Sequence, residues 1–225
     1  MVFMVFGVIG ATSGIAEETK KPESVEARVS YALGLNIGHG FKAQGIDIQT
    51  DLFLKGLNDG LSGANPLLTN EEMRTAMETL RADLEEKQRA KLEEIGKKNL
   101  EESEKFFAAN KKEKGVVTLP SGLQYKVEKE GTGKSPGKDD TVTVHYTGTL
   151  LNGQEFDSSH KRGQPATFKV GGVIPGWTEA LQLMKEGAKW KLFIPSDLAY
   201  GEQGRPPVIY PNSALIFDVE LLKVN

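Results

Sequence analysis

The stretch from Val142 to Val224 decides the fold of this chain through five segments: VTVHYTGTL (142–150), GQEFDSSHKRG (153–163), VIPGWTEAL (173–181), PSDLAYGE (195–202) and ALIFDVELLKV (214–224). Alternating apolar and polar residues predict strands, as at Val142, Val144 and Tyr146 and at Leu215, Phe217, Val219 and Leu221. One helical face is formed by Trp177, Ala180, Leu181 and Met184, and we expect Gly187 to close that helix. The segments predict an antiparallel sheet wrapped around one short helix, with aromatic residues walling an apolar pocket for a small apolar group.

Composition narrows the possible functions. The 225 residues include 28 basic and 31 acidic side chains, a balance that argues against nucleic acid as a partner, and the length is comfortable for two domains. Cysteine is absent, which removes thiol catalysis, thiolate metal sites and disulfides.

The first stretch, MVFMVFGVIGATSGIA (1–16), is apolar for about the length of a signal-peptide core and ends with Gly14 and Ala16 at a small-x-small spacing. We interpret residues 1–16 as a secretion signal. No Lys or Arg precedes the apolar run, so a buried or disordered terminus is the alternative.

Residues 17–68 are predicted to form two short helices separated at Gly45. Their apolar residues recur at helical spacing, at Val25, Val29, Ala32, Leu33 and Ile37 and then at Leu52, Phe53, Leu57 and Leu61. Two such helices hold too little apolar surface to be stable alone, so we expect their faces to be buried against another copy in a homodimer.

A long charged helix is predicted over residues 69–114, capped by Thr69 or Asn70. An apolar seam marks its first part, at Met73, Met77, Leu80 and Leu84. Beyond Arg89 the helix is polar all round, which favours a strut through solvent over a surface helix lying along a globular body, and Gly96 should be a weak point in it. Alternating periodicity begins after Gly115, so the fold class is α+β, with the sheet domain over residues 115–225.

The polar residues of the sheet domain are poor candidates for acyl transfer or metal chemistry. Asp157, Ser158, Ser159 and His160 are consecutive, and consecutive residues cannot form the geometry of a catalytic triad. The three histidines show no metal-ligand spacing, so we expect neither a metal nor a cofactor.

The five segments, in their order and spacing, resemble the FK506-binding-protein (FKBP) class of peptidyl-prolyl isomerases from Gly122 to Val224. The whole chain, including the GIDI segment, the charged helix and the linking LPSGLQYKV, resembles the macrophage infectivity potentiator (Mip) and FkpA-like subgroup of secreted bacterial FKBPs. That resemblance implies a V-shaped homodimer, joined through the N-terminal helices, with an isomerase on each arm. It also implies a location in the periplasm, on the outer membrane or at the cell surface.

Carried over motif by motif, the resemblance implies a set of site residues. The catalytic residues would be Asp157, Tyr200 and Tyr146. The substrate-binding residues would be Phe156, Val173, Ile174, Trp177, Ile209, Phe217, Arg162 and Phe168. Trp177 would form the pocket floor, while the Ile174 backbone amide and the Tyr200 hydroxyl would donate to carbonyls of a bound peptide or macrolide.

Two positions depart from human-type FKBPs. Ala166 stands where those proteins have an aromatic residue, so one wall of the pocket would be missing or supplied by Phe168. Arg205 replaces a histidine in the loop after AYG. Both changes concern the rim of the pocket, and hence the substrate preference.

The resemblance implies rotation of X-Pro bonds without a covalent intermediate, in a pocket that strips water from an amide whose barrier is about 18–20 kcal/mol. The partners would be proline-containing peptides and unfolded proteins. Macrolides of the FK506 and rapamycin type would inhibit the isomerase. Two pockets on one dimer could assist the folding of one client. The alternative is a non-catalytic holdase or surface binding module with a vestigial pocket.

Overall fold

The computed structural model describes residues 21–225, so the expected signal segment lies outside the described residues. Its elements are α1 (Val25–Gln44), α2 (Thr50–Ser62), α3 (Asn70–Asn110), β1 (Val116–Thr118), β2 (Gln124–Lys129), β3 (Thr141–Leu150), β4 (Glu155–Ser158), β5 (Ala166–Lys169), η1 (Val170–Gly172), α4 (Pro175–Leu183), β6 (Lys189–Ile194), η2 (Ser196–Leu198) and β7 (Leu215–Val224). The chain divides into two compact units, one ending at Glu78 and one beginning at Thr79, so α3 belongs to both. From residue 21 onward, no helix is long and apolar enough to cross a membrane.

The first unit contains the two predicted short helices. Gly45 ends α1 with φ 66°, in the left-handed region that glycine adopts freely, which confirms the predicted break. The rings of Phe41 and Phe53 join α1 to α2, edge to face with centroids 5.5 Å apart. Neither helix contains a buried residue, and apart from this ring pair, apolar side chains such as Val25, Leu33 and Leu61 stay exposed in the described part of the chain.

The start of α3 decides between the two predicted caps, Thr69 and Asn70, in favour of Thr69. The Thr69 hydroxyl accepts the Glu72 amide proton at 3.2 Å, and the Glu72 carboxylate accepts the Thr69 amide proton at 2.8 Å. This reciprocal arrangement is a capping box, which satisfies two amide groups that the helix leaves without partners.

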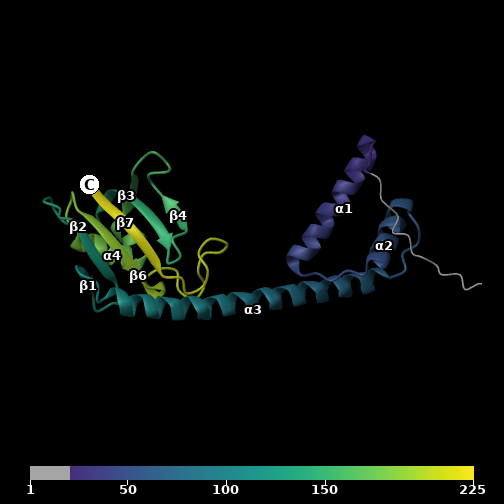
Figure 1. The fold of residues 1–225 in the computed structure, drawn as a ribbon, viewed down its shortest axis with the longest axis horizontal. Coiled ribbons are helices and arrows are strands. Elements are labelled where there is room, and N and C mark those ends of the chain that lie inside the picture. Colours follow the sequence, from purple (N-terminus) through teal and green to yellow (C-terminus); the bar gives the residue numbers. More distant parts are fainter. Residues whose placement is uncertain (1–20) are drawn as a thin grey trace, which may run out of the picture. The chain divides into compact units, whose positions relative to one another are not determined.

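The expectation of a strut through solvent is wrong for the last part of α3, where the helix lies against the sheet domain (Figure 1). Gly96 and Ser103 are buried, and the Phe106 ring contacts Phe193 of β6 with centroids 5.7 Å apart. Gln124 of β2 also donates to the carbonyl of Phe107 at 3.1 Å. Small and polar residues make much of this contact, and a search for an apolar stripe does not detect such residues.

The second unit contains the predicted antiparallel sheet wrapped around one short helix. The strand order is β1-β2-β6-β7-β3-β4, with β5 also paired to β3, and every pair is antiparallel. Side chains of α4 and of the sheet form one core, which includes the fully buried Val144, Leu181, Ile194 and Leu215. Figure 1 shows α4 among the strands that it packs against.

The expected end of α4 at Gly187 is wrong, because the helix ends at Leu183. Met184 turns into an extended conformation, and its amide bonds back to the carbonyl of Ala180 at 3.0 Å. Gly187 instead adopts φ 90° in the turn that leads into β6.

Candidate functional site

An apolar cleft of about 460 Å³ opens where α4 meets β3, β4, β5 and β7. Pro175 at the first position of α4 fixes the helix start, which places Trp177 in the first turn with only 4% of its surface exposed. Three rings stand almost perpendicular to the Trp177 indole, with centroid separations of 5.2, 5.9 and 5.2 Å for Tyr146, Phe168 and Phe217. Edge-to-face contacts of this kind hold aromatic rings in fixed orientations.

The remaining lining comes from strand ends and loops. Phe156 of β4 stands edge-on to Phe217 at 5.5 Å and 90°. Val173 and Ile174 come from the turn between η1 and α4, and Tyr200 and Arg205 come from the loop that follows η2. Within residues 21–225, neither the backbone amide of Ile174 nor the hydroxyl of Tyr200 has a hydrogen-bond partner. Two donors are therefore available to a ligand in this cleft.

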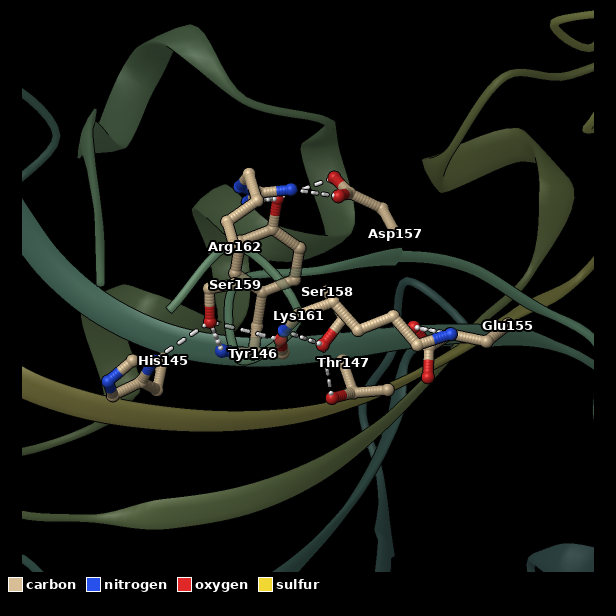
Figure 2. Close-up of polar contacts among 9 residues, drawn as sticks. All are labelled: His145, Tyr146, Thr147, Glu155, Asp157, Ser158, Ser159, Lys161 and Arg162. Carbon is tan, nitrogen blue, oxygen red and sulfur yellow. Dashed lines mark hydrogen bonds and ion pairs between the residues drawn. The ribbon is translucent and has the colours of Figure 1, made fainter. Parts of the chain in front are cut away.

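Tyr146, Asp157 and Arg162 form a polar cluster (Figure 2), and Tyr146 and Asp157 also line the cleft. The Tyr146 hydroxyl donates to Asp157 at 2.5 Å, and Arg162 donates to the same hydroxyl at 2.8 Å. The other terminal nitrogen of Arg162 forms an ion pair with Asp157, and the guanidinium lies 5.4 Å from the centre of the Tyr146 ring. These contacts fix the Tyr146 ring as a wall of the cleft.

The charge states of this cluster follow from the same contacts. Burial, the largest single influence, raises the pKa of Asp157, but hydrogen bonds from Tyr146 and Arg162 and the guanidinium charge together hold that pKa below its usual value. Burial is also the main cause that raises the pKa of the Tyr146 phenol, and the hydrogen bond to Asp157 adds to it. At neutral pH the cluster therefore contains an ionised carboxylate and a protonated phenol.

Ser159 and His160 do not form a triad with Asp157. The Ser159 hydroxyl is fully buried, accepts the Tyr146 amide proton at 2.8 Å and lies 2.9 Å from Nδ1 of His145. His160 stacks on His145 with centroids 4.4 Å apart, while Asp157 is engaged by Tyr146 and Arg162. The Ser159 hydroxyl, through its bond to the Tyr146 amide, holds the backbone of β3 in place. Within residues 21–225, no three acidic, histidine or cysteine side chains lie together as metal ligands.

The structure brings most of the expected site residues to one cleft, lined by Tyr146, Phe156, Asp157, Phe168, Val173, Ile174, Trp177, Tyr200 and Phe217. Phe168 lines the cleft and Ala166 does not. Arg162 reaches the site through its bonds to Asp157 and Tyr146. Ile209 is 4% exposed and packs in the core, and it does not line the cleft.

Gly148 is a further site residue, and the sequence reasoning missed it. It lies near the end of β3, opposite Phe217 of β7 and Asp157 of β4. A Cβ at this position would lie 2.7 Å from both Phe156 and Phe217, so the two rings need a glycine beneath them. The available signal was a glycine inside an otherwise β-branched and aromatic strand, which marks a close approach.

Comparison with known proteins gives two family matches. Residues 132–222 match the FKBP-type peptidyl-prolyl cis-trans isomerase family, and residues 26–127 match the domain amino terminal to FKBP-type peptidyl-prolyl isomerase. The chain is 46% identical to the outer membrane protein MIP of Legionella longbeachae, over 98% of this chain and 95% of that protein. It is 44% identical to the peptidyl-prolyl cis-trans isomerase Mip of Coxiella burnetii, over 99% and 96%. The crystal structure of FkpA from Escherichia coli matches with a TM-score of 0.74 at 40% identity, over 90% of this chain and 98% of that one.

Proposed function

This chain belongs to the FKBP-type peptidyl-prolyl cis-trans isomerase family, and on that premise we propose that its catalytic centre is the cleft over Trp177. Family membership makes the chain an enzyme that rotates X-Pro bonds. The main support for this position of the catalytic centre is that three aromatic rings stand almost perpendicular to the Trp177 indole. Such a box is apolar on its floor and walls, and it suits a proline ring.

Catalysis at this cleft needs no covalent step. Resonance keeps the amide planar and places negative charge on its oxygen, and water stabilises that polar form. The apolar cleft removes this water while it holds the proline ring. The less polar twisted form therefore loses less hydration energy than the planar form does, and the barrier falls. Each 1.36 kcal/mol removed from the barrier raises the rate about tenfold.

The polar groups have different roles in this proposal. Ile174 and Tyr200 donate to peptide carbonyls outside the rotating bond, because a donor on the reacting carbonyl would stabilise the planar form. Asp157 is ionised at the cleft edge, where a negative charge near the reacting oxygen disfavours the planar form more than the twisted one. Tyr146 and Arg162 keep that carboxylate in place.

The test is isomerisation of a proline tetrapeptide by the full chain and by Asp157→Leu. We expect at least a tenfold lower kcat/KM for this variant. Asp139→Leu is the matched control, because Asp139 is an exposed carboxylate in an ion pair with Lys169, outside the cleft. If wild type and Asp157→Leu catalyse equally, the cleft is not the catalytic centre. If wild type binds proline peptides without isomerising them, the chain is a holdase with a vestigial pocket.

We assign dimerisation to residues 17–68 together with the first turns of α3. Exposed apolar side chains lie on several faces of α1, including Val25 at 71%, Tyr31 at 65% and Leu33 at 58% exposure. Exposed apolar side chains that the rest of the described chain does not cover mark a surface for another protein chain. A second cleft, lined by Leu52, Leu67, Leu68 and Met73 among others, adds apolar surface in the same unit. A second copy of this unit is the occupant that would cover both surfaces.

A homodimer of this kind would present two isomerase clefts to one unfolded client, which raises the effective concentration of the second cleft. Chaperone activity toward unfolded proteins is therefore part of the proposal, as is inhibition by macrolides of the FK506 and rapamycin type at the cleft. The Legionella relative is named an outer membrane protein, which supports a cell-envelope location for this chain. Separation of periplasmic and outer-membrane fractions, followed by detection of the protein, would test that location.

A further inference from the structure

The loop of residues 200–213, here called the pocket loop, is closed on itself and supplies part of the cleft. It contributes Tyr200 and Arg205 to the lining. The Asn212 amide donates to the carbonyl of Gly201 at 2.9 Å, which joins the two ends of the loop beside Tyr200. Near the tip, Arg205 and Ile209 exchange both backbone hydrogen bonds, at 2.5 and 3.1 Å. A displacement at the base of this loop therefore acts directly on the backbone next to Tyr200.

The helix α3 holds this base through side-chain hydrogen bonds. Asn99 donates from Nδ2 to the carbonyl of Pro211 at 2.8 Å and to the Ser213 hydroxyl at 3.2 Å. In the reverse direction, Asn212 donates from Nδ2 to the carbonyl of Gly96 at 3.2 Å. The helix and the loop thus exchange hydrogen bonds, and Asn212 keeps its own backbone at φ 57°, a conformation that asparagine tolerates.

Close packing accompanies these hydrogen bonds. Gly96 is buried, and a Cβ there would lie 3.0 Å from Cβ of Pro211. Glycine in the middle of a helix is destabilising relative to alanine. In this helix the glycine allows α3 to approach the loop closely enough for Asn99 to reach Pro211. None of these contact residues lines the cleft.

We propose that Asn99 is a positioning residue for the isomerase reaction, an inference that rests on the proposed role of Tyr200. Asn99 fixes Pro211, Pro211 and Asn212 fix the base of the pocket loop, and that base fixes the Tyr200 hydroxyl relative to Trp177. The last part of α3 is therefore part of the catalytic unit, in addition to linking two regions of the chain.

A double-mutant cycle in the full chain tests this route, with kcat and KM measured on a proline tetrapeptide. Asn99→Ala should lower kcat/KM about threefold to tenfold, mainly through a higher KM, because the donor to the peptide carbonyl is no longer held in place. In the Tyr200→Phe background the same change should have almost no further effect. Asn99→Asp keeps the side-chain size but lacks the donor, so it should behave like Asn99→Ala. The control is Glu101→Ala, an exposed position on the same helix, which should match wild type.

Each other outcome overturns the inference. If Asn99→Ala has the wild-type KM and only a lower Tm, Asn99 serves stability alone. If the losses from Asn99→Ala and Tyr200→Phe multiply, Asn99 acts through some other route. If Tyr200→Phe is itself silent, the proposed role of Tyr200 fails, and the route through it fails as well. If Tyr200→Phe lowers kcat/KM but Asn99→Ala leaves it unchanged, the role of Tyr200 stands and only the positioning role of Asn99 is refuted.

Discussion

Replacement of Gly148 by alanine should damage the cleft more than the fold. The added Cβ would lie 2.7 Å from Cζ of Phe156 and 2.7 Å from Cε1 of Phe217. Carbon atoms in good contact are about 3.5 Å apart, so each ring has to retreat by roughly 0.8 Å. Phe217 is only 5% exposed and stands edge-on against Trp177, so its retreat pushes into the base of the cleft.

The expected cost is that of overpacking, about 1–3 kcal/mol. If the cost falls on the substrate-bound cleft, kcat/KM should drop roughly 5- to 150-fold, at 1.36 kcal/mol for each factor of ten. Phe156 is partly exposed and can swing toward solvent, so we expect the free protein to relax and its Tm to fall by only a few degrees.

The assay is tetrapeptide isomerisation at 25 °C, with near-ultraviolet circular dichroism to measure the folded fraction. Gly137→Ala is the control, because its Cβ would meet only Asp140, at an ordinary contact distance of 3.7 Å. Full activity in Gly148→Ala would refute the reasoning, and so would an activity loss that merely follows the unfolded fraction.

Three further predictions concern the polar edge, the domain boundary and the dimer. Isomerase activity should be constant from about pH 5 to pH 9, because the lowered pKa of Asp157 keeps it ionised and the raised pKa of Tyr146 keeps it protonated. A rate profile with a midpoint near pH 7 would contradict this prediction of constant activity. The contribution of Asp157 to folding stability is present above its usual pKa near 4 and is lost as the pH falls through its lower folded-state pKa. Residues 79–225 should keep tetrapeptide activity, whereas residues 115–225 should have a lower Tm because they lose the contact of Phe106 with Phe193; equal melting temperatures would argue against this packing. Met73→Glu combined with Met77→Glu should give monomers in light scattering, because two charges in an apolar interface cost several kcal/mol, and an unchanged dimer mass would move the interface elsewhere.

The sequence alone determined the features that depend on neighbouring residues. Strand alternation follows from the two-residue repeat of an extended chain, as the buried positions of β3 show. The cap at Thr69 and the break at Gly45 follow from local backbone chemistry. The aromatic set of the cleft was also recognisable, because several motifs occur together in a fixed order along the chain.

Only the tertiary structure decided which residues meet across long separations in sequence. Asn99 reaches Pro211 across 112 residues, and Gly148 is required by rings from two other strands, so no local pattern reports either contact. Ile209 was expected in the cleft and lies in the core, because the closed pocket loop turns it inward. The solvent strut was wrong for a related reason. The periodicity of α3 shows that it lacks an apolar stripe, but glycine, serine and asparagine can form a buried contact when the partner surface is complementary.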